Sequence, residues 1–503
     1  MKKIVRKLRI LQCKIFLLLL VIVASVGLWH VWKPLPAGIS VEGSLYSFDS
    51  SSVQFLFDHT YMTSEGVRQS DQEIFDAVFA MIVEAREFIV LDMFLFNDFL
   101  GTSTTSYRAL SDELTEALIA KQQASPDMRI VFITDPVNGV YGGDPSAQII
   151  ALQDAGVQVI ETDVRALRDS NPLYSGLWRT LLQWWGNSPT GGSLPHVMDV
   201  RRDDLTVLTY LRLLNFKANH RKVIVADDGQ DSVQTLVTSA NPHDGSSAHS
   251  NVALQVRESR AVEGIWSDVL RAEQAVVDFS GSDDYKFIDD LLGDQFHVPS
   301  ESEADHSVNL QLVTEGKIKE ALLADIDRSD VGDTIDMALF YISDRDIVTA
   351  LADAARRGVQ IRMILDPNKD AFGREKNGIP NRQVAYEFTA ASENISVRWC
   401  NTQGEQCHSK LTIFRIGTER TMHIGSANLT RRNIGDYNLE MNVVMRSEND
   451  KALAITDADD FFTLLWANGD NKISTLDYEA YADDSVLRKY LYRIMEATGM
   501  SSF

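Results

Sequence analysis

The stretch HRKVIVAD at residues 220–227 has a counterpart in HSKLTIFR at residues 408–415, and this pair decides the expected fold. Each stretch begins with His-Xaa-Lys and continues as an apolar, β-branched run, which is the pattern of a buried strand. At almost the same distance each is followed by Ser-Ala-Asn, at residues 239–241 and 426–428. Two such matches in one chain predict a duplicated site that handles phosphate groups.

The repeated pattern resembles the signature of the phospholipase D superfamily, which is His-Xaa-Lys, four residues, Asp, and then a Gly/Ser-rich turn ending in Asn. The first copy fits fully, with Asp227 at the position of the aspartate. The second copy has Arg415 there, but its downstream residues 425–428 and 438–440 fit closely. The resemblance covers roughly residues 50–450.

Further echoes between the two halves support a duplication. LDMFLF at residues 91–96 resembles IDMALF at 335–340, and RIVFITDP at 129–136 resembles QIRMILDP at 360–367. Helix-like stretches such as residues 344–357 lie between these strands, so each half is expected to be an α/β sandwich. We therefore predict an α/β fold of two tandem similar α/β-sandwich halves, packed face to face around one shared active site and preceded by one transmembrane helix.

Composition and pattern divide the 503 residues into five segments. They are a basic flank and membrane anchor at 1–32, a first half at 45–280 with an insertion at about 163–213, a linker at 281–308, a second half at 309–450, and a C-terminal helical extension at 451–503.

The N-terminus has the composition of a membrane anchor. Six Lys or Arg residues precede the uncharged run at residues 15–32, whose length is close to the ~18 residues that a spanning helix needs. Trp29 and Trp32 stand where interfacial aromatic residues gather. A cleaved signal peptide has a shorter apolar core, so we favour an uncleaved anchor over a cleaved signal. The positive-inside rule then predicts a single-pass protein of a bacterial inner membrane, with its catalytic part on the periplasmic side.

The rest of the chain is strongly acidic. Removing the first 32 residues removes six of the 48 basic residues and none of the 71 acidic ones, which leaves a formal charge of −29. Nucleic-acid binding depends on neutralising phosphates with Lys and Arg. We therefore expect no nucleic-acid partner, while the sequence leaves the oligomeric state open.

The two motifs carry the groups that phosphodiester cleavage needs, namely a nucleophile, a proton for the leaving oxygen and donors for the phosphoryl oxygens. Imidazole can supply the first two near neutral pH, and lysine and asparagine supply charge and directed hydrogen bonds. Residues two apart on a strand point to the same face. The His and Lys of both motifs can therefore line one pocket between the halves.

The resemblance implies a two-step reaction through a phosphohistidine, without a metal or another cofactor. By analogy with lipid-acting relatives, His220 is assigned the attack on phosphorus and His408 the acid/base role. The catalytic residues that follow are His220, Lys222, Asp227, Asn241, His408, Lys410, Asn428 and Glu440.

The family also has a Glu or Asp near the end of each half, which orients a catalytic imidazole through its other nitrogen. Glu440 fits this position in the second half. Aligning Asn251 with Asn438 puts Ala253 at the corresponding position of the first half. Asp92 is therefore expected to orient the histidine of the first motif.

The insertion indicates contact with lipid. Residues 173–185 hold three of the eight tryptophans, and a Trp/Leu-rich stretch with an arginine suits a membrane interface. A lid helix packed on the protein core is the other interpretation. The residues expected to bind substrate are Ser239, Ser426, Asp92, Asp336, Trp178, Trp184 and Trp185. For the two aspartates, membership of two similar core strands is the alternative.

The sequence thus predicts a membrane-anchored, phospholipase D-like enzyme whose partners are membrane phospholipids. It would hydrolyse glycerophospholipids or transfer the phosphatidyl group to an alcohol, as cardiolipin synthase-like relatives do. One alternative is a nuclease of the same family. Another is a non-catalytic lipid-binding or scaffold protein with degenerate motifs, since Arg415 departs from the signature.

Two cysteines flank the turn before the second motif. Cys400 and Cys407 can pair in an oxidising compartment or remain free thiols, and the sequence supports both equally.

Overall fold

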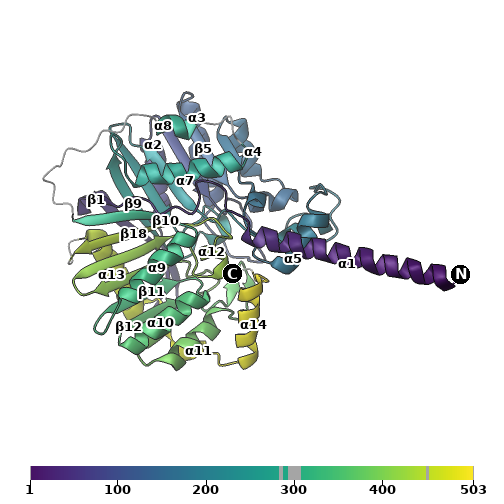
Figure 1. Cartoon of the computed structure of the whole chain (residues 1–503). Coiled ribbons are helices and arrows are strands. Elements are labelled where there is room, and N and C mark those ends of the chain that lie inside the picture. Colours follow the sequence, from purple (N-terminus) through teal and green to yellow (C-terminus); the bar gives the residue numbers. More distant parts are fainter. Residues whose placement is uncertain (1, 282–286, 293–306, 449–451, 502–503) are drawn as a thin grey trace.

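The computed structural model describes residues 2–281, 287–292, 307–448 and 452–501 (Figure 1). Two mixed β-sheets lie at its centre, one from each half of the chain. The main strands of the first sheet are β2 (Val53–Thr63), β4 (Phe88–Met93), β5 (Arg129–Thr134), β6 (Gln158–Glu161), β7 (Lys222–Asp227), β8 (Ser232–Thr238) and β9 (Asn251–Ser259). Those of the second are β10 (Val308–Thr314), β11 (Thr334–Leu339), β12 (Gln360–Leu365), β15 (Ile395–Cys400), β16 (Lys410–Ile416), β17 (Glu419–Gly425) and β18 (Met441–Glu448).

The two sheets share one topology. The spatial order β2-β9-β8-β7-β4-β5-β6 repeats as β10-β18-β17-β16-β11-β12-β15. In both sheets the first five strands of this order pair antiparallel and the last three pair parallel. The chain also visits the equivalent strands in the same sequence. This confirms the predicted tandem α/β halves.

Helices cover the outer face of each sheet. They are α2 (Ile74–Glu84), α3 (Leu110–Ala124) and α4 (Ala147–Asp154) in the first half, and α9 (Gly316–Arg328), α10 (Arg345–Arg357) and α11 (Asn381–Ala391) in the second. Helix α10 shows how the sequence sets such an element. The Asp344 side chain accepts from the Ile347 N–H at 3.2 Å and caps its start, and Gly358, with φ 110°, ends it. Between these ends the helix buries Leu351 and Ala354.

The inner faces of the two sheets share one hydrophobic core. Val225 and Leu254 of the first sheet belong to the same buried cluster as Ile413 and Val443 of the second. Helices α7 (Ile265–Phe279) and α13 (Leu453–Ala467) contribute to this cluster. Burial of apolar side chains between the sheets therefore holds the halves face to face, at about 25 cal/mol for each Å² removed from water.

The strand register corrects the alignment of the halves. The lysine of the first motif pairs with Met93, and that of the second pairs with Leu339. The expected match of Asp92 with Asp336 is therefore wrong by two residues, and Asp92 corresponds to Ala338. Both segments contain Asp followed by Met, and the alignment matched these two pairs instead of the residues that are equivalent in the strand register.

The N-terminal helix α1 (Lys2–Trp32) extends away from the two halves (Figure 1). Its segment from Lys3 to Trp32 is long and apolar enough to cross a membrane, and an 18-residue window within it has a mean hydropathy of 2.4. The C-terminal part of α1 packs on α5 (Pro172–Leu177), which lies in the insertion. Gly27 permits this approach, because a Cβ there would lie 2.6 Å from the Pro172 carbonyl oxygen.

The remaining elements complete the sheets and the insertion. The insertion continues from α5 into a π-helical turn (Trp178–Leu182) and α6 (Val207–Leu213). The predicted linker falls largely on residues outside the described ranges, and α8 (Phe287–Leu291) lies within it. Beyond α13, the C-terminal segment adds β19 (Lys472–Ile473) to the first sheet, β20 (Thr475–Asp477) to the second, and α14 (Val486–Thr498). The short elements are β1 (Tyr46–Phe48), β3 (Arg68–Asp71), β13 (Asp370–Ala371), β14 (Arg374–Glu375) and α12 (Arg431–Ile434).

Candidate active site

The two motif histidines line one cavity between the halves. His220 precedes β7 and His408 precedes β16, and the cavity that both of them line has a volume of about 390 Å³. Asn241 and Asn428, from the turns after β8 and β17, line it as well. The structure thus brings together two side chains from each predicted motif.

Reciprocal backbone hydrogen bonds place each histidine against the opposite half. The His220 N–H donates to the Leu439 carbonyl at 2.9 Å, and the His408 N–H donates to the Ser250 carbonyl at 2.8 Å. In each case the residue after that carbonyl belongs to the opposite half and reaches the imidazole. The arrangement has an approximate two-fold symmetry that the duplicated topology imposes.

The imidazole partners therefore cross between the halves. Nδ1 of His220 lies 2.8 and 3.0 Å from the two carboxylate oxygens of Glu440. Nδ1 of His408 lies 3.0 Å from the Ser239 carbonyl oxygen and 3.1 Å from Oδ1 of Asn251. One histidine is thus held by a carboxylate and the other by neutral groups.

Asn251 is the first-half counterpart of Glu440. The Ser239 hydroxyl donates to Asn251 in the way that the Ser426 hydroxyl donates to Glu440. The assignment of Ala253 to this position is therefore wrong. The alignment failed because it matched an asparagine with an asparagine two residues away from the true register.

The expectation that Asp92 orients His220 is also wrong. Asp92 is buried in the first sheet, where its Oδ2 accepts from Asn219 Nδ2 at 2.6 Å. Asp336 is buried too and forms an ion pair with Arg415 at 2.6 Å. Neither aspartate is among the described residues that line the histidine cavity.

Asp227 and Arg415, at the ends of the two motifs, make contacts that support the fold. Asp227 accepts the backbone N–H groups of Glu87 and Phe88, each at 2.9 Å, and so fixes the start of β4. Arg415 instead bridges Asp336 and Asp459 with its two terminal nitrogens. The unusual arginine thus has two acidic partners. Neither Asp227 nor Arg415 is among the described residues that line the cavity.

Each lysine lies beside an aromatic ring that lines the cavity. The ammonium group of Lys222 is 4.9 Å from the ring centre of Phe94, and that of Lys410 is 5.3 Å from that of Phe340. The same rings lie 4.7 and 4.8 Å from the imidazole of their own half. Each lysine also donates to the carbonyl of its motif histidine. The sequence contained both rings, but the shifted alignment hid their equivalence.

The asparagines of the motifs differ in their bonding. Oδ1 of Asn428 is buried without a hydrogen-bond partner among the described residues. Oδ1 of Asn241 accepts only a long bond of 3.4 Å from the Leu95 N–H. Both amides line the cavity and can therefore turn toward a bound molecule.

Burial sets the protonation of the site. It lowers the pKa of His220 and of His408 well below the usual histidine range, and the nearby ammonium groups lower it further. Burial also lowers the pKa of Lys222 to about 7 and raises that of Glu440 to about 8. Both imidazoles are therefore neutral in the free protein. In His408 the hydrogen must lie on Nδ1, because the Ser239 carbonyl can only accept, so Nε2 carries the lone pair.

Two aspartates that follow equivalent strands hold the residues before the histidines. Oδ2 of Asp135 accepts the Asn219 N–H at 2.7 Å, and Oδ2 of Asp366 accepts the Cys407 N–H at 2.9 Å. Cys407 also forms a disulfide with Cys400, so the structure selects the paired form of these cysteines. The sequence showed both aspartates as part of the repeat without indicating this role.

Replacing both cysteines by serine is expected to lower both stability and activity. A disulfide that closes a loop this short contributes about 2 kcal/mol through the unfolded state, and its loss frees the backbone next to His408. Thermal unfolding and turnover of the double variant, compared with those of the oxidised wild type, measure the two effects. Wild-type values for both would contradict this expectation.

The structure places the three tryptophans of the insertion away from the histidine cavity. Trp178 is buried and lines a separate hollow near Lys217, whereas Trp184 and Trp185 are 75% and 68% exposed. None of them is among the described residues that line the histidine cavity. Other insertion residues do line it, namely Val197, Met198 and Leu213.

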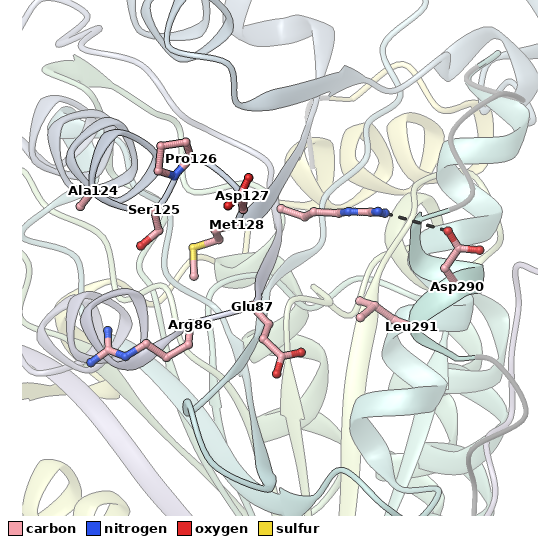
Figure 2. Close-up of a pocket in the computed structure, with 10 residues that line it drawn as sticks. Arg86, Glu87, Ala124, Ser125, Pro126, Asp127, Met128, Asp290 and Leu291 are labelled. Atoms are coloured by element: carbon pink, nitrogen blue, oxygen red, sulfur yellow. Dashed lines mark ion pairs between the residues drawn. The ribbon is translucent and has the colours of Figure 1, made fainter.

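A wider hollow of about 640 Å³ lies on the outer side of the first half, where α3 ends and β5 begins (Figure 2). Asp127 and Arg86 line it, and an ion pair of 3.9 Å between Arg129 and Asp290 crosses one side. None of its described lining residues comes from either motif. The motif residues that line a cavity are therefore in the histidine cavity and not in this hollow.

Comparison with known proteins agrees with this geometry. Residues 322–466, which include the second motif, match the family model of the cardiolipin synthase PLD-like domain. This part of the chain therefore contains a phospholipase D-like domain. The phosphatidylserine synthase of Haemophilus influenzae Rd KW20 has a similar fold, with a TM-score of 0.53 at 9% identity over 94% of this chain and 99% of its own.

A second solved structure is similar to part of this phospholipase D-like protein. The phospholipase D family member Nuc of Salmonella typhimurium is 20% identical over 34% of this chain and 98% of its own, with a TM-score of 0.27. Comparison with curated proteins finds no match. The family supports a phosphodiesterase or transferase activity.

Proposed function

We propose that this protein is a membrane-anchored phosphodiesterase or phosphatidyltransferase that acts on glycerophospholipids through a phosphohistidine. The observation that carries the proposal is the pair of histidines on one cavity, each held through Nδ1 by the opposite half. Neither half alone contains both a nucleophile and an acid. The assembled site contains both.

The unequal partners of the imidazoles support His220 as the nucleophile. Attack through Nε2 forms an N–P bond and leaves positive charge on the ring, which favours the ionised form of Glu440 beside it. The P–O bond to the leaving alcohol breaks, and its oxygen takes a proton from Nε2 of His408. The negative charge of a bound phosphodiester favours the protonated form of His408. The neutral hydrogen-bond partners of His408 do not stabilise that form further, so it releases its proton readily.

The second step reverses these roles. Water or an acceptor alcohol attacks phosphorus, gives its proton to Nε2 of His408, and the N–P bond to His220 breaks. Asn241 and Asn428 are placed to donate hydrogen bonds to the phosphoryl oxygens. The choice between hydrolysis and transfer then depends on which hydroxyl group enters the cavity.

The cavity walls support a lipid substrate. Apart from the motif residues they are largely apolar, with Val137, Met198, Phe216 and Phe372 among the lining side chains. Such walls suit the glycerol and acyl part of a phospholipid. The neighbouring α1 helix would keep the catalytic part close to the bilayer, on the periplasmic side if the basic N-terminus stays in the cytoplasm.

The direct test is lipid mass spectrometry on purified full-length protein incubated with mixed phospholipids. Without glycerol we expect phosphatidic acid, and with glycerol we expect phosphatidylglycerol to form at its expense. The His408→Asn variant is the control for contaminating activity. Unchanged lipids in both conditions with the wild type would count against the proposed function.

The two exposed tryptophans of the insertion are expected to contribute to activity at membranes but not to the catalytic step itself. Replacing Trp184 and Trp185 by serine should reduce activity on vesicles at least ~10-fold and leave activity on a small soluble phosphodiester unchanged. The melting temperature of the double variant should also stay close to that of the wild type, because exposed substitutions change stability by only about 0.5 kcal/mol.

A matched control for the tryptophan variant lies on the second half. Val331 is 76% exposed, and its replacement by serine should leave both activities unchanged. Equal losses of the tryptophan variant on vesicles and on the soluble substrate would show that these residues serve the fold and not the membrane.

A further inference from the structure

One buried cation on the wall of the histidine cavity has two nitrogens without a hydrogen-bond partner among the described residues. Arg432 in α12 lines the cavity with only 4% of its surface exposed. Its Nη2 donates to the carbonyls of Gly499 and Ser501, but Nε and Nη1 are buried with no partner among the described residues. Leaving such donors unpaired is unfavourable, and more so for a charged group. Within the part of the chain that the structure describes, Nε and Nη1 of Arg432 are thus free to bind a further group.

The charge of Arg432 is compensated only in part among the described residues, by the Phe216 ring, whose centre lies 5.3 Å away, and by the nearby Glu496. No described carboxylate forms an ion pair with it, since Glu496, which is near, accepts instead from the backbone N–H of Arg431. Burial lowers the pKa of Arg432 to about 10, so the guanidinium stays charged near neutral pH. A buried, unpaired cation is costly, and an anion at this wall of the cavity would remove the cost.

Only the second half has an arginine at this position. Arg432 lies four residues after Asn428, and the equivalent position after Asn241 is Gly245. A side chain at Gly245 would collide with its surroundings, because a Cβ there would lie 2.8 Å from the Phe99 carbonyl oxygen. Of these two equivalent positions, therefore, only the one in the second half carries a cation, and Arg374 and Lys376 are further cations on the cavity wall.

We propose that Arg432 binds a second anionic group, a phosphate or a carboxylate, carried by the headgroup or the acceptor of the phosphodiester that the two histidines handle. The proposal rests on the proposed function and deepens it. It predicts that either the lipid headgroup or the acceptor of the preferred substrates carries a negative charge in addition to that of the reacting phosphate. The guanidinium is placed for this, because it lines the same cavity as His220 and His408.

A binding experiment tests the subsite without turnover. Full-length protein in detergent is titrated by calorimetry with alkanediol bisphosphates of two to five carbons and with the matching monoalkyl phosphates, none of which is a phosphodiester. For the best-fitting length we expect the bisphosphate to bind at least ~10-fold more tightly than the monophosphate, as one charged hydrogen bond allows. In Arg432→Gln this ratio should fall below ~3.

Two further variants keep the test decisive. Arg431→Gln is the matched control, because Arg431 donates to the Ser170 carbonyl and to Tyr437 and is not among the described cavity residues. It should keep the wild-type ratio. If Arg432→Gln fails to fold, as thermal unfolding would show, Arg432→Lys replaces it, and its ratio should fall at least ~3-fold. A wild-type ratio in the folded Arg432 variant overturns the proposal, as does a wild type without preference.

Turnover then separates the two sources of the anion. The headgroup arm compares phosphatidylserine with phosphatidylcholine, and the acceptor arm compares glycerol 3-phosphate with glycerol. A selective loss in Arg432→Gln on either anionic member supports the proposal and identifies the source. An equal loss on all four means that Arg432 contacts the reacting phosphate, which overturns it. If the wild type turns over nothing but keeps its binding ratio, the proposed function fails and the anion subsite stands.

Discussion

Replacing His220 or His408 by asparagine should abolish turnover of phospholipids, and the two losses should differ in kind. The His220→Asn variant has no nucleophile and should show no activity above background. The His408→Asn variant lacks the acid and base, whose removal typically costs 10²–10⁴-fold. A substrate with a good leaving group needs no acid, so it should still phosphorylate the second variant.

The label distinguishes the roles directly. Incubation with a 4-nitrophenyl phosphodiester, acid-free digestion and mass spectrometry should find an acid-labile phosphohistidine at position 220 of His408→Asn and none in His220→Asn. A label at position 408 of His220→Asn would reverse the assignment. Absence of label from both variants would argue against covalent catalysis.

Replacing Glu440 by glutamine should slow the reaction about 10–100-fold, the usual cost of losing a group that orients a functional histidine. The amide keeps the size of the side chain but cannot oppose the positive charge on the phosphorylated ring. Rapid-quench measurement of intermediate formation should therefore show that the first step slows. An unchanged first step would mean that Glu440 only fills space.

The reciprocal change at Asn251 provides a control with a different readout. Asn251→Asp puts a carboxylate 3.1 Å from Nδ1 of His408 in place of the amide oxygen. A negative charge there favours the protonated imidazole and raises its pKa, so the limb of the pH–rate profile that reports His408 should move to higher pH. A purely structural role for Asn251 predicts no such movement.

The motifs, the strands and the N-terminal apolar helix were accessible from the sequence because each is a local pattern. His-Xaa-Lys at residues 220–222 and 408–410 sits at the start of a β-branched run, and such a run forms a buried strand wherever it lies. The repeat of these patterns predicted the duplicated α/β halves. The uncharged run at residues 15–32 predicted the long apolar helix in the same way.

The partners of the catalytic groups were decided by the tertiary structure alone. Glu440 reaches His220, and Asn251 reaches His408, across an interface between two halves. Nothing near a histidine in sequence indicates which carboxylate will face it, because the choice depends on how the sheets pack. Asp92 was assigned to His220 from an alignment that the strand register shifts by two residues.

The sequence by itself therefore predicted the fold and supplied the proposal for the reacting groups. The tertiary structure decided how these groups are oriented, that the two histidines have different partners, and that two nitrogens of the buried Arg432 have no partner among the described residues. Local spacing fixes which face of a strand a side chain takes. Burial, charge pairing and the pKa of each group depend on atoms brought together from distant parts of the chain, and only the packed structure brings them together.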